Sequence, residues 1–332
     1  AIYTADYGEK SVHVLDRETK DIETVSLEEL CDFKWAKKPG NIGIETAHLR
    51  VSFFEDEEVD YKSILNIVSQ AKQSGCTGVV GLGVMGESAR LTDVERTKVS
   101  KTIIDAAHDL PVTLGTTADS TKAAIDRSKE AEEMGATAVM ISAPSMLKSN
   151  ENALFSHYER IAKSISIPIV MQDYPLTSGV DMPISFISRV ANEIPLVKYL
   201  KLEDPPTPTK ISAIREQIGD ALGIFGGLGG VFLLDELRRG SIGAMTGFAF
   251  PEVLVDICSL MKSGNTEAAE NLFYTHLPLI QFEQQEGIGL AIRKAGLYHR
   301  GFIKSPTVRS PAGQLASTTH KELKSIIEKV GL

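Results

Sequence analysis

Residues 137–173 read TAVMISAPSMLKSNENALFSHYERIAKSISIPIVMQD, and the pattern of this segment indicates the fold class of the chain. Two short apolar runs, Thr137–Ala143 and Ile167–Asp173, flank a longer amphipathic segment, Ala153–Ser164. Short apolar runs of this kind predict buried strands, and the segment between them predicts a helix. The order strand, helix, strand indicates two parallel strands joined by a helical crossover.

The same alternation recurs along most of the chain. We expect further strands at His48–Phe53, Thr77–Gly83, Pro111–Gly115, Leu196–Lys201, Leu222–Gly226 and Ile242–Gly247. We expect further helices at Tyr61–Ser74, Asp93–His108, Ser120–Met134, Ile184–Asn192, Lys210–Gly219 and Phe232–Arg239. Their boundaries are marked by Thr92, an N-cap with Glu95 three residues later, and by Gly75 and Gly135 after helix ends. Eight such units predict an α/β fold, a (β/α)8 TIM barrel over residues 46–250.

A doubly wound open sheet is the alternative architecture. Residues 81–86, Gly-Leu-Gly-Val-Met-Gly, match the G-x-G-x-x-G pattern of dinucleotide-binding sheets by letter count. That pattern also requires an acidic residue after the next strand, whereas Asp105 and Asp109 fall in and after a helix. The barrel is therefore the favoured interpretation.

The two ends of the chain lie outside the barrel pattern. Residues 1–45 carry only weak strand (Ser11–Leu15) and helix (Ser26–Asp32) signals, so we interpret them as an N-terminal extension of unknown role. Residues 251–332 are expected to form a helical region packed on the barrel. Its predicted helices are Pro251–Lys262, Thr266–Phe282, Gly287–Leu297 and Lys321–Val330.

Composition limits the function classes. The 332 residues are 42% hydrophobic and have a formal net charge of −9, which disfavours nucleic acid and anionic membranes as partners. No window predicts a membrane span or a secretory signal, and Cys31, Cys76 and Cys258 fit no disulfide or metal spacing, so we expect a cytoplasmic protein. A small anionic substrate would also be repelled, so its site must supply positive or N–H groups of its own.

Functional groups of such a barrel lie at the C-terminal ends of its strands. In the sixth strand, period-two alternation places Val197, Tyr199 and Lys201 on one face. If Lys201 faces the barrel axis, burial lowers its pKa from about 10.4, and the free amine can attack a carbonyl carbon. Spacing alone also allows a solvated lysine, with Lys198 equally free to take either part.

Other strand ends add weaker candidates. The backbone at Gly83–Met85 can approach a ligand closely, as can the glycines of Gly226–Gly230, and Gln172 shares a strand face with Tyr174. Glu203 follows Lys201 by two residues and could act as a base, although a loop anchor is the favoured role.

Two remaining expectations concern residues outside this set. His157 lies in a helical pattern and is predicted to be at the surface. No strand end carries a His/Asp/Glu cluster, so no metal site is expected.

In order along the chain, these motifs resemble the dihydrodipicolinate synthase/N-acetylneuraminate lyase family of Schiff-base enzymes. The resemblance spans roughly residues 50–300. The segments at Leu82–Ser88, Ile169–Asp181, Val197–Lys201 and Gly226–Leu228 look like the family's G-T-T-G-E, Y-N-V-P-x-R-T-G-x-D, G-I-K and S-G-D segments. By this resemblance Lys201 forms the imine, and Gly83, Val84 and Met85 lie where pyruvate's carboxylate is held.

The sequence also departs from the family pattern. Val84 and Met85 replace the two threonines, and Gln172 stands at the position of the catalytic tyrosine, where glutamine cannot act as a general acid or base. Thr177 aligns with the arginine that grips the second substrate. The tyrosine contributed by a neighbouring subunit aligns near Ser145 or Met146.

We therefore expect a divergent member of this family that lacks the usual catalytic tyrosine. It acts as a Schiff-base lyase, an aldolase or dehydratase, on pyruvate or a 2-oxo acid such as a 2-keto-3-deoxy sugar acid. Lys201 and Tyr174 are the catalytic candidates, and Gly83, Val84, Met85, Gln172, Thr177 and Gly227 are the substrate-binding candidates. No cofactor is expected, because the imine is the electron sink; the resemblance implies a homotetramer. The alternatives are a true dihydrodipicolinate synthase and a keto-acid-binding barrel without catalysis.

Overall fold

The computed structural model describes residues 2–6, 11–15, 22–26, 46–145 and 150–332. The chain divides into two units, Ala1–Asn41 and Ile42–Leu332. In the first unit, β1 (Ile2–Asp6), β2 (Ser11–Leu15) and β3 (Ile22–Ser26) form an antiparallel sheet in the order β1-β2-β3. The predicted strand Ser11–Leu15 is confirmed as β2. Of the predicted helix Ser26–Asp32, Ser26 ends β3 and the rest lies outside the described residues.

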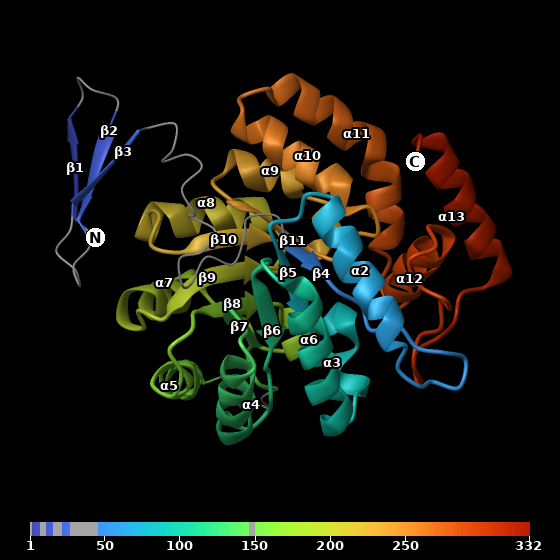
Figure 1. The fold of residues 1–332 in the computed structure, drawn as a ribbon, viewed down its shortest axis with the longest axis horizontal. Coiled ribbons are helices and arrows are strands. Elements are labelled where there is room, and N and C mark those ends of the chain that lie inside the picture. Colours follow the sequence, from blue (N-terminus) through green and yellow to red (C-terminus); the bar gives the residue numbers. More distant parts are fainter. Residues whose placement is uncertain (1, 7–10, 16–21, 27–45, 146–149) are drawn as a thin grey trace. The chain divides into compact units, whose positions relative to one another are not determined.

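The second unit is built on a closed barrel of eight parallel strands, as predicted (Figure 1). The strands follow one another around the barrel in chain order, and β11 closes the ring by pairing with β4. They are β4 (Thr46–His48), β5 (Gly78–Gly81), β6 (Val112–Gly115), β7 (Ala138–Ser142), β8 (Ile169–Asp173), β9 (Val197–Leu202), β10 (Gly223–Gly226) and β11 (Gly243–Thr246). The strand predicted at His48–Phe53 lies earlier, at Thr46–His48, because the chain turns away after its pairing with β5.

Helices surround the barrel (Figure 1). Between strands lie α2 (Tyr61–Gln73), α3 (Asp93–Ala107), α4 (Thr121–Glu133), α5 (Glu151–Ala162), α6 (Pro175–Ser178), α7 (Ile184–Glu193), α8 (Thr207–Ile218) and α9 (Leu233–Arg238). After β11 come α10 (Pro251–Lys262), α11 (Thr266–Glu283), α12 (Gly289–His299) and α13 (Ser317–Lys329). The predicted capping box at Thr92 and Glu95 is present at the start of α3. No helix among the described residues is long and apolar enough to cross a bilayer.

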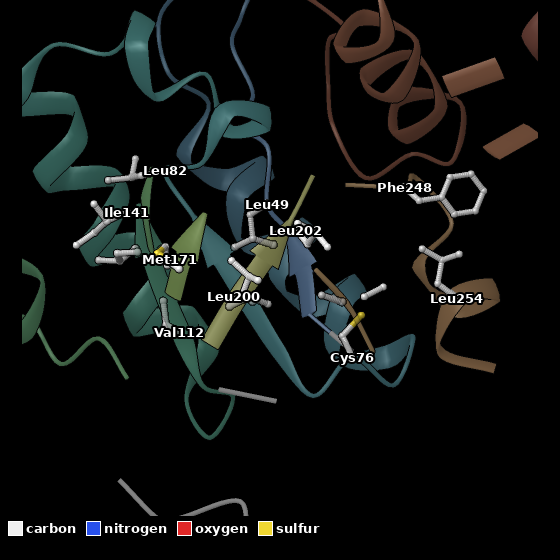
Figure 2. Packing of buried hydrophobic residues seen from close by; sticks show 14 of the residues in the cluster. Leu49, Cys76, Leu82, Val112, Ile141, Met171, Leu200, Leu202, Phe248 and Leu254 are labelled. Atoms are coloured by element: carbon white, nitrogen blue, oxygen red, sulfur yellow. The ribbon is translucent and has the colours of Figure 1, made fainter. Parts of the chain in front are cut away.

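The strands bury both faces, which explains their nearly continuous apolar sequences. One face packs against the surrounding helices, and Figure 2 shows Leu200 and Leu202 of β9 in this outer cluster with Met171 and Ile141. The other face fills the barrel interior with a smaller cluster of buried side chains. Its members are Val80, Ala138, Met140, Val170, Phe225 and Met245, against which Tyr199 and Ile242 pack.

A β-bulge in β9 changes the predicted alternation. The pairing of β8 with β9 jumps from Ile169↔Val197 to Val170↔Tyr199, so Lys198 is an extra residue and is exposed. Val197 therefore belongs to the outer cluster, and the prediction that it shares a face with Tyr199 and Lys201 was wrong. The bulge leaves Tyr199 and Lys201 on the interior face.

His157 was predicted to be at the surface, and this was wrong. The side chain of His157 in α5 is buried, and its Nδ1 lies 2.9 Å from Thr121 Oγ1 of α4. Burial lowers the pKa of His157 to about 4, with the charge of Arg160 adding to the effect. The imidazole is thus a neutral packing group between two helices.

Candidate active site

Lys201 is the penultimate residue of β9 and lies at the mouth of the barrel. Its side chain is buried, with the whole residue 4% exposed, and its backbone pairs with Gln172 at the end of β8. Its Nζ atom lies 2.8 Å from Glu203 Oε2. Burial lowers the pKa of Lys201, while the negative charge and hydrogen bond of Glu203 partly oppose the shift.

Glu203 directly follows β9 and keeps the strand's direction, since its backbone N–H donates to the Asp173 carbonyl at 2.8 Å. Its Oε2 accepts a hydrogen bond from Gln172 Nε2 at 2.7 Å, and its Oε1 accepts one from the Leu228 backbone at 3.3 Å. The carboxylate therefore anchors the loop after β10 and also touches the amine of Lys201. The sequence had left these two roles as alternatives.

The two glycines at the end of β10 and directly after it make room for two buried carboxylates. A Cβ at Gly227 would collide with the Glu203 side chain, and one at Gly226 would collide with the Glu236 carboxylate. The predicted close approach at this loop is thus an approach by the protein's own acidic groups. Gly227 lies behind Glu203, whereas Leu228 and Gly229 line the cavity itself.

The cavity at Lys201 combines groups from several strand ends and from the C-terminal helices. Tyr174 enters it from the start of α6, with Gln172 two residues before it as alternation predicted. The cavity is lined by His48, Val84, Met85, Gln172, Tyr174, Lys201, Glu203, Leu228, Gly229, Thr246, Gly247, Gln284 and Arg293.

The loop after β5 separates this cavity from a second one. Val84 and Met85 lie in η2 (Val84–Gly86) and line the Lys201 cavity, whereas Gly83 lines the neighbouring one. Thr177 also lines the second cavity, and Val84 and Gln172 border both. Burial raises the pKa of Tyr174, with Glu203 adding to the shift and a hydrogen bond from Thr177 opposing it.

Sequence reasoning missed several lining residues, among them His48, Gln284 and Arg293. Burial lowers the pKa of His48 well below 6.5, and the charge of Lys201 adds to this, so its imidazole is neutral. His48 is the last residue of β4, where strand-end reasoning could have found it. Gln284 caps α11 and Arg293 lies within α12, and no rule about strand ends points to either.

Comparison with known proteins assigns this geometry to a family. Residues 42–330 match the model of the dihydrodipicolinate synthetase family. The chain belongs to this family. It is 32% identical to the L-2-keto-3-deoxyarabonate dehydratase of Azospirillum brasilense over 284 residues, 84% of this chain and 91% of the relative. It is 28% identical to the 4-hydroxy-tetrahydrodipicolinate synthase of Methanothrix thermoacetophila over 282 residues, 84% and 93% of the two chains.

The solved structure of dihydrodipicolinate synthase from Rhodopseudomonas palustris superimposes with a TM-score of 0.82 at 33% identity. That alignment covers 88% of this chain and 98% of the other. The predicted family, barrel fold and Schiff-base lyase class are therefore confirmed.

The C-terminal region of this lyase braces the loop after β5. Lys294 of α12 forms a fully buried ion pair with Glu87, and its Nζ also donates to the Thr307 carbonyl at 2.8 Å. Glu87 has a left-handed backbone conformation (φ 51°) and accepts a further bond from the Arg309 backbone at 3.1 Å. These contacts hold the loop that carries Val84 and Met85 into the cavity.

Metal ligands form no cluster in the part of the chain that the structure describes. No group of three or more His, Cys, Asp or Glu side chains among these residues could hold a metal ion.

Proposed function

We propose that this lyase removes water from a 2-keto-3-deoxy sugar acid, with Lys201 as the imine-forming amine and Glu203 as the acid and base. One observation carries the proposal: a carboxylate oxygen of Glu203 lies 2.8 Å from the amine of Lys201, inside the same cavity. Both side chains are buried, so neither is a freely solvated charge.

Lys201 starts the reaction. Its lowered pKa increases the fraction of neutral amine, which adds to the C2 carbonyl of the substrate; loss of one water then gives the protonated imine. The C=N⁺ bond withdraws electrons from C3, and a C3 proton becomes acidic. Lys201 is thus the group on which every later step depends.

Glu203 completes the elimination. C3 is one bond from the carbon attached to Nζ, so a carboxylate that touches Nζ lies within reach of a C3 hydrogen. Glu203 removes that proton to give the enamine, then returns it to the C4 hydroxyl, which leaves as water. Hydrolysis of the unsaturated imine frees the product and restores the Lys201 amine.

The absence of the family's tyrosine from this site is part of the proposal. Gln172 stands in its place and donates to Glu203 Oε2 at 2.7 Å, so its role is to orient the carboxylate. Tyr174 is the second acid/base candidate. Burial raises the pKa of its phenol, which keeps the proton and suits it to donate a hydrogen bond to a substrate hydroxyl.

The other predicted contacts suit a substrate longer than pyruvate. The backbone at Gly83–Met85 takes the carboxylate, and Gly227 acts through Glu203, against which it packs. Gln172 borders both cavities, and Thr177 lies in the second, so a sugar-acid chain extending from Lys201 can meet both residues.

Three broader expectations remain proposals: residues 46–250 as the barrel with 1–45 and 251–332 as its extensions, a homotetramer, and a cytoplasmic location. The family resemblance supports the tetramer. Light scattering of the purified chain tests it, and a monomer in solution would contradict it.

Borohydride reduction in the presence of pyruvate, followed by peptide mass mapping, tests the mechanism. We expect one adduct, on Lys201; its absence would overturn the mechanism. Turnover is then compared between 2-keto-3-deoxy-L-arabonate and the pair pyruvate plus aspartate semialdehyde. Ordinary turnover of the second pair, without dehydration of the first, would show a synthase instead.

A further inference from the structure

Two buried arginines adjoin the Lys201 cavity and share one acidic partner. Arg293 lines the cavity from α12, and Arg50 lies behind its wall at Gly247, where a Cβ would sit 3.2 Å from Arg50 Nη2. Glu283, the last residue of α11, lies 3.5 Å from Arg293 Nε, and its charge also acts on Arg50. Each arginine is only 4% exposed.

Arg293 has more donors than strong acceptors. Its Nη2 donates to Gln284 Oε1 at 2.6 Å, and its Nη1 donates to the sulfur of Met85 at 3.1 Å. A thioether is a weak acceptor. Its Nε lies 3.5 Å from Glu283 Oε2 and has no hydrogen-bond partner among the described residues. Buried guanidinium groups are normally saturated by acceptors, so this one is suited to an anionic ligand.

The local charge balance points the same way. Glu203 pairs with Lys201, which leaves Glu283 as the main carboxylate that the described residues place near the two guanidinium groups. Nε and Nη2 of Arg50 also have no partner among the described residues. This pocket is therefore positive within a chain whose formal charge is −9. The pocket can therefore attract a small anionic substrate that the net negative charge of the chain would otherwise repel.

We propose that Arg293 donates from its side chain to the C1 carboxylate of the 2-oxo acid, beside the backbone of the loop that carries Val84 and Met85, with Arg50 behind it as a second positive charge. This inference rests on the proposed function, because it places the carboxylate next to the imine carbon on Lys201. Arg293 contacts the Met85 side chain, and Met85 and Val84 carry no hydroxyl that could bind the carboxylate. The guanidinium supplies the side-chain donors at this edge of the cavity.

The competing placement puts Arg293 at the far end of the substrate. Pyruvate distinguishes these two placements of Arg293. Its carboxylate is attached directly to the carbonyl carbon, and its other substituent is a methyl group with no distal polar atoms. Pyruvamide has the same skeleton without the charge. A residue that binds the C1 carboxylate affects pyruvate strongly and pyruvamide little.

The experiment measures the concentration of pyruvate or pyruvamide that gives half-maximal borohydride trapping, for the wild type and Arg293→Gln. We expect the wild type to prefer pyruvate. In Arg293→Gln the pyruvate value rises on the order of 10- to 100-fold, since a buried charge-assisted bond is lost, while the pyruvamide value stays within about threefold. Arg300→Gln is the matched control. Arg300 is an arginine at the C-terminal cap of α12, but it pairs with Glu252 and does not line the cavity.

Equal pyruvate trapping by Arg293→Gln and the wild type would overturn this inference and leave the proposed function intact. Absence of any adduct in the wild type would instead overturn the proposed function. If Arg293→Gln does not fold, Arg293→Met replaces the guanidinium by an uncharged apolar side chain and leaves Glu283 to interact with Arg50. The same loss of preference is expected there, and retained preference would contradict it.

Discussion

Two buried lysine–glutamate pairs lie among the described residues, and in only one of them does the lysine line a cavity. Lys294 pairs with Glu87, and its ammonium also meets the Thr307 carbonyl and the Phe53 ring, 4.5 Å from the ring centroid. Lys201 pairs with Glu203 and lines the cavity. Among the described residues, Glu203 is the partner found for its ammonium group. Burial lowers the pKa of Lys294 to about 8 and lowers the pKa of Lys201 as well.

A lowered pKa alone therefore does not identify a reactive amine. Both lysines are desolvated, and both have an acidic partner. Lys294 is saturated on every side and cannot meet a substrate carbon, so its amine is structural. Lys201 differs because its Nζ atom lines a cavity, where a substrate carbonyl carbon can reach it.

The largest expected effect comes from replacing each of the two lysines and measuring the reduced pyruvate adduct. Lys201→Met abolishes the reduced pyruvate adduct, with a loss of roughly 1,000-fold or more, because the nucleophile is gone. Lys294→Met still forms the adduct on Lys201 when it is assayed at a temperature at which this variant is folded. Mass mapping of both variants after borohydride treatment checks this, and an adduct that persists in Lys201→Met refutes the assignment.

The next effect separates the two carboxylates. Glu203→Gln slows exchange of the methyl protons of pyruvate with D2O by roughly 100- to 10,000-fold, since a general base is lost, while trapping on Lys201 continues. Proton NMR of pyruvate follows the exchange. Tyr174→Phe is the matched variant: a loss as large as that of Glu203→Gln would move the base to the phenol.

A third prediction concerns the free energy of unfolding. Here replacing Lys294 has a larger effect than replacing Lys201, the reverse of their effects on the adduct. Lys294→Met leaves Glu87 buried without its main partner and costs about 3 kcal/mol of unfolding free energy. Lys201→Met costs no more than about 1 kcal/mol, because a polar cavity adjoins Glu203. Chemical denaturation of both variants measures this, and equal losses would show that Lys201 is also a structural residue.

The smallest effect is a shift along the pH axis. Glu203 raises the pKa of Lys201 against the lowering by burial, so Glu203→Gln lowers that pKa further. The neutral amine is the nucleophile, so the rise of imine formation with pH moves to lower pH, by about one unit. Trapping rates measured against pH test this. Glu252→Gln, which removes a carboxylate paired with Arg300, should leave the curve in place.

Much of the fold could be predicted from the sequence because strand and helix periods are local. The strands of residues 137–173 were found within two residues of their observed bounds. The face of Val197 could not be predicted, because the bulge at Lys198 depends on how β9 pairs with β8.

The site was predictable only where it follows from a strand end. Lys201, Gln172 and Tyr174 line one cavity, as alternation predicted. Arg293 comes from a helix more than 90 residues after Lys201 and enters the cavity only through the packing of α12. Such a contact depends on tertiary packing and leaves no local pattern in the sequence.

The packing of Glu203 against Gly227 has a consequence for the descent of this chain. With Glu203 in its observed position, a Cβ at residue 227 would collide with the Glu203 side chain. Glu203 and Gly227 therefore form a structurally coupled pair. Among related genes, glutamate at the first position should therefore be accompanied by glycine at the second, which makes the pair a marker for sorting them.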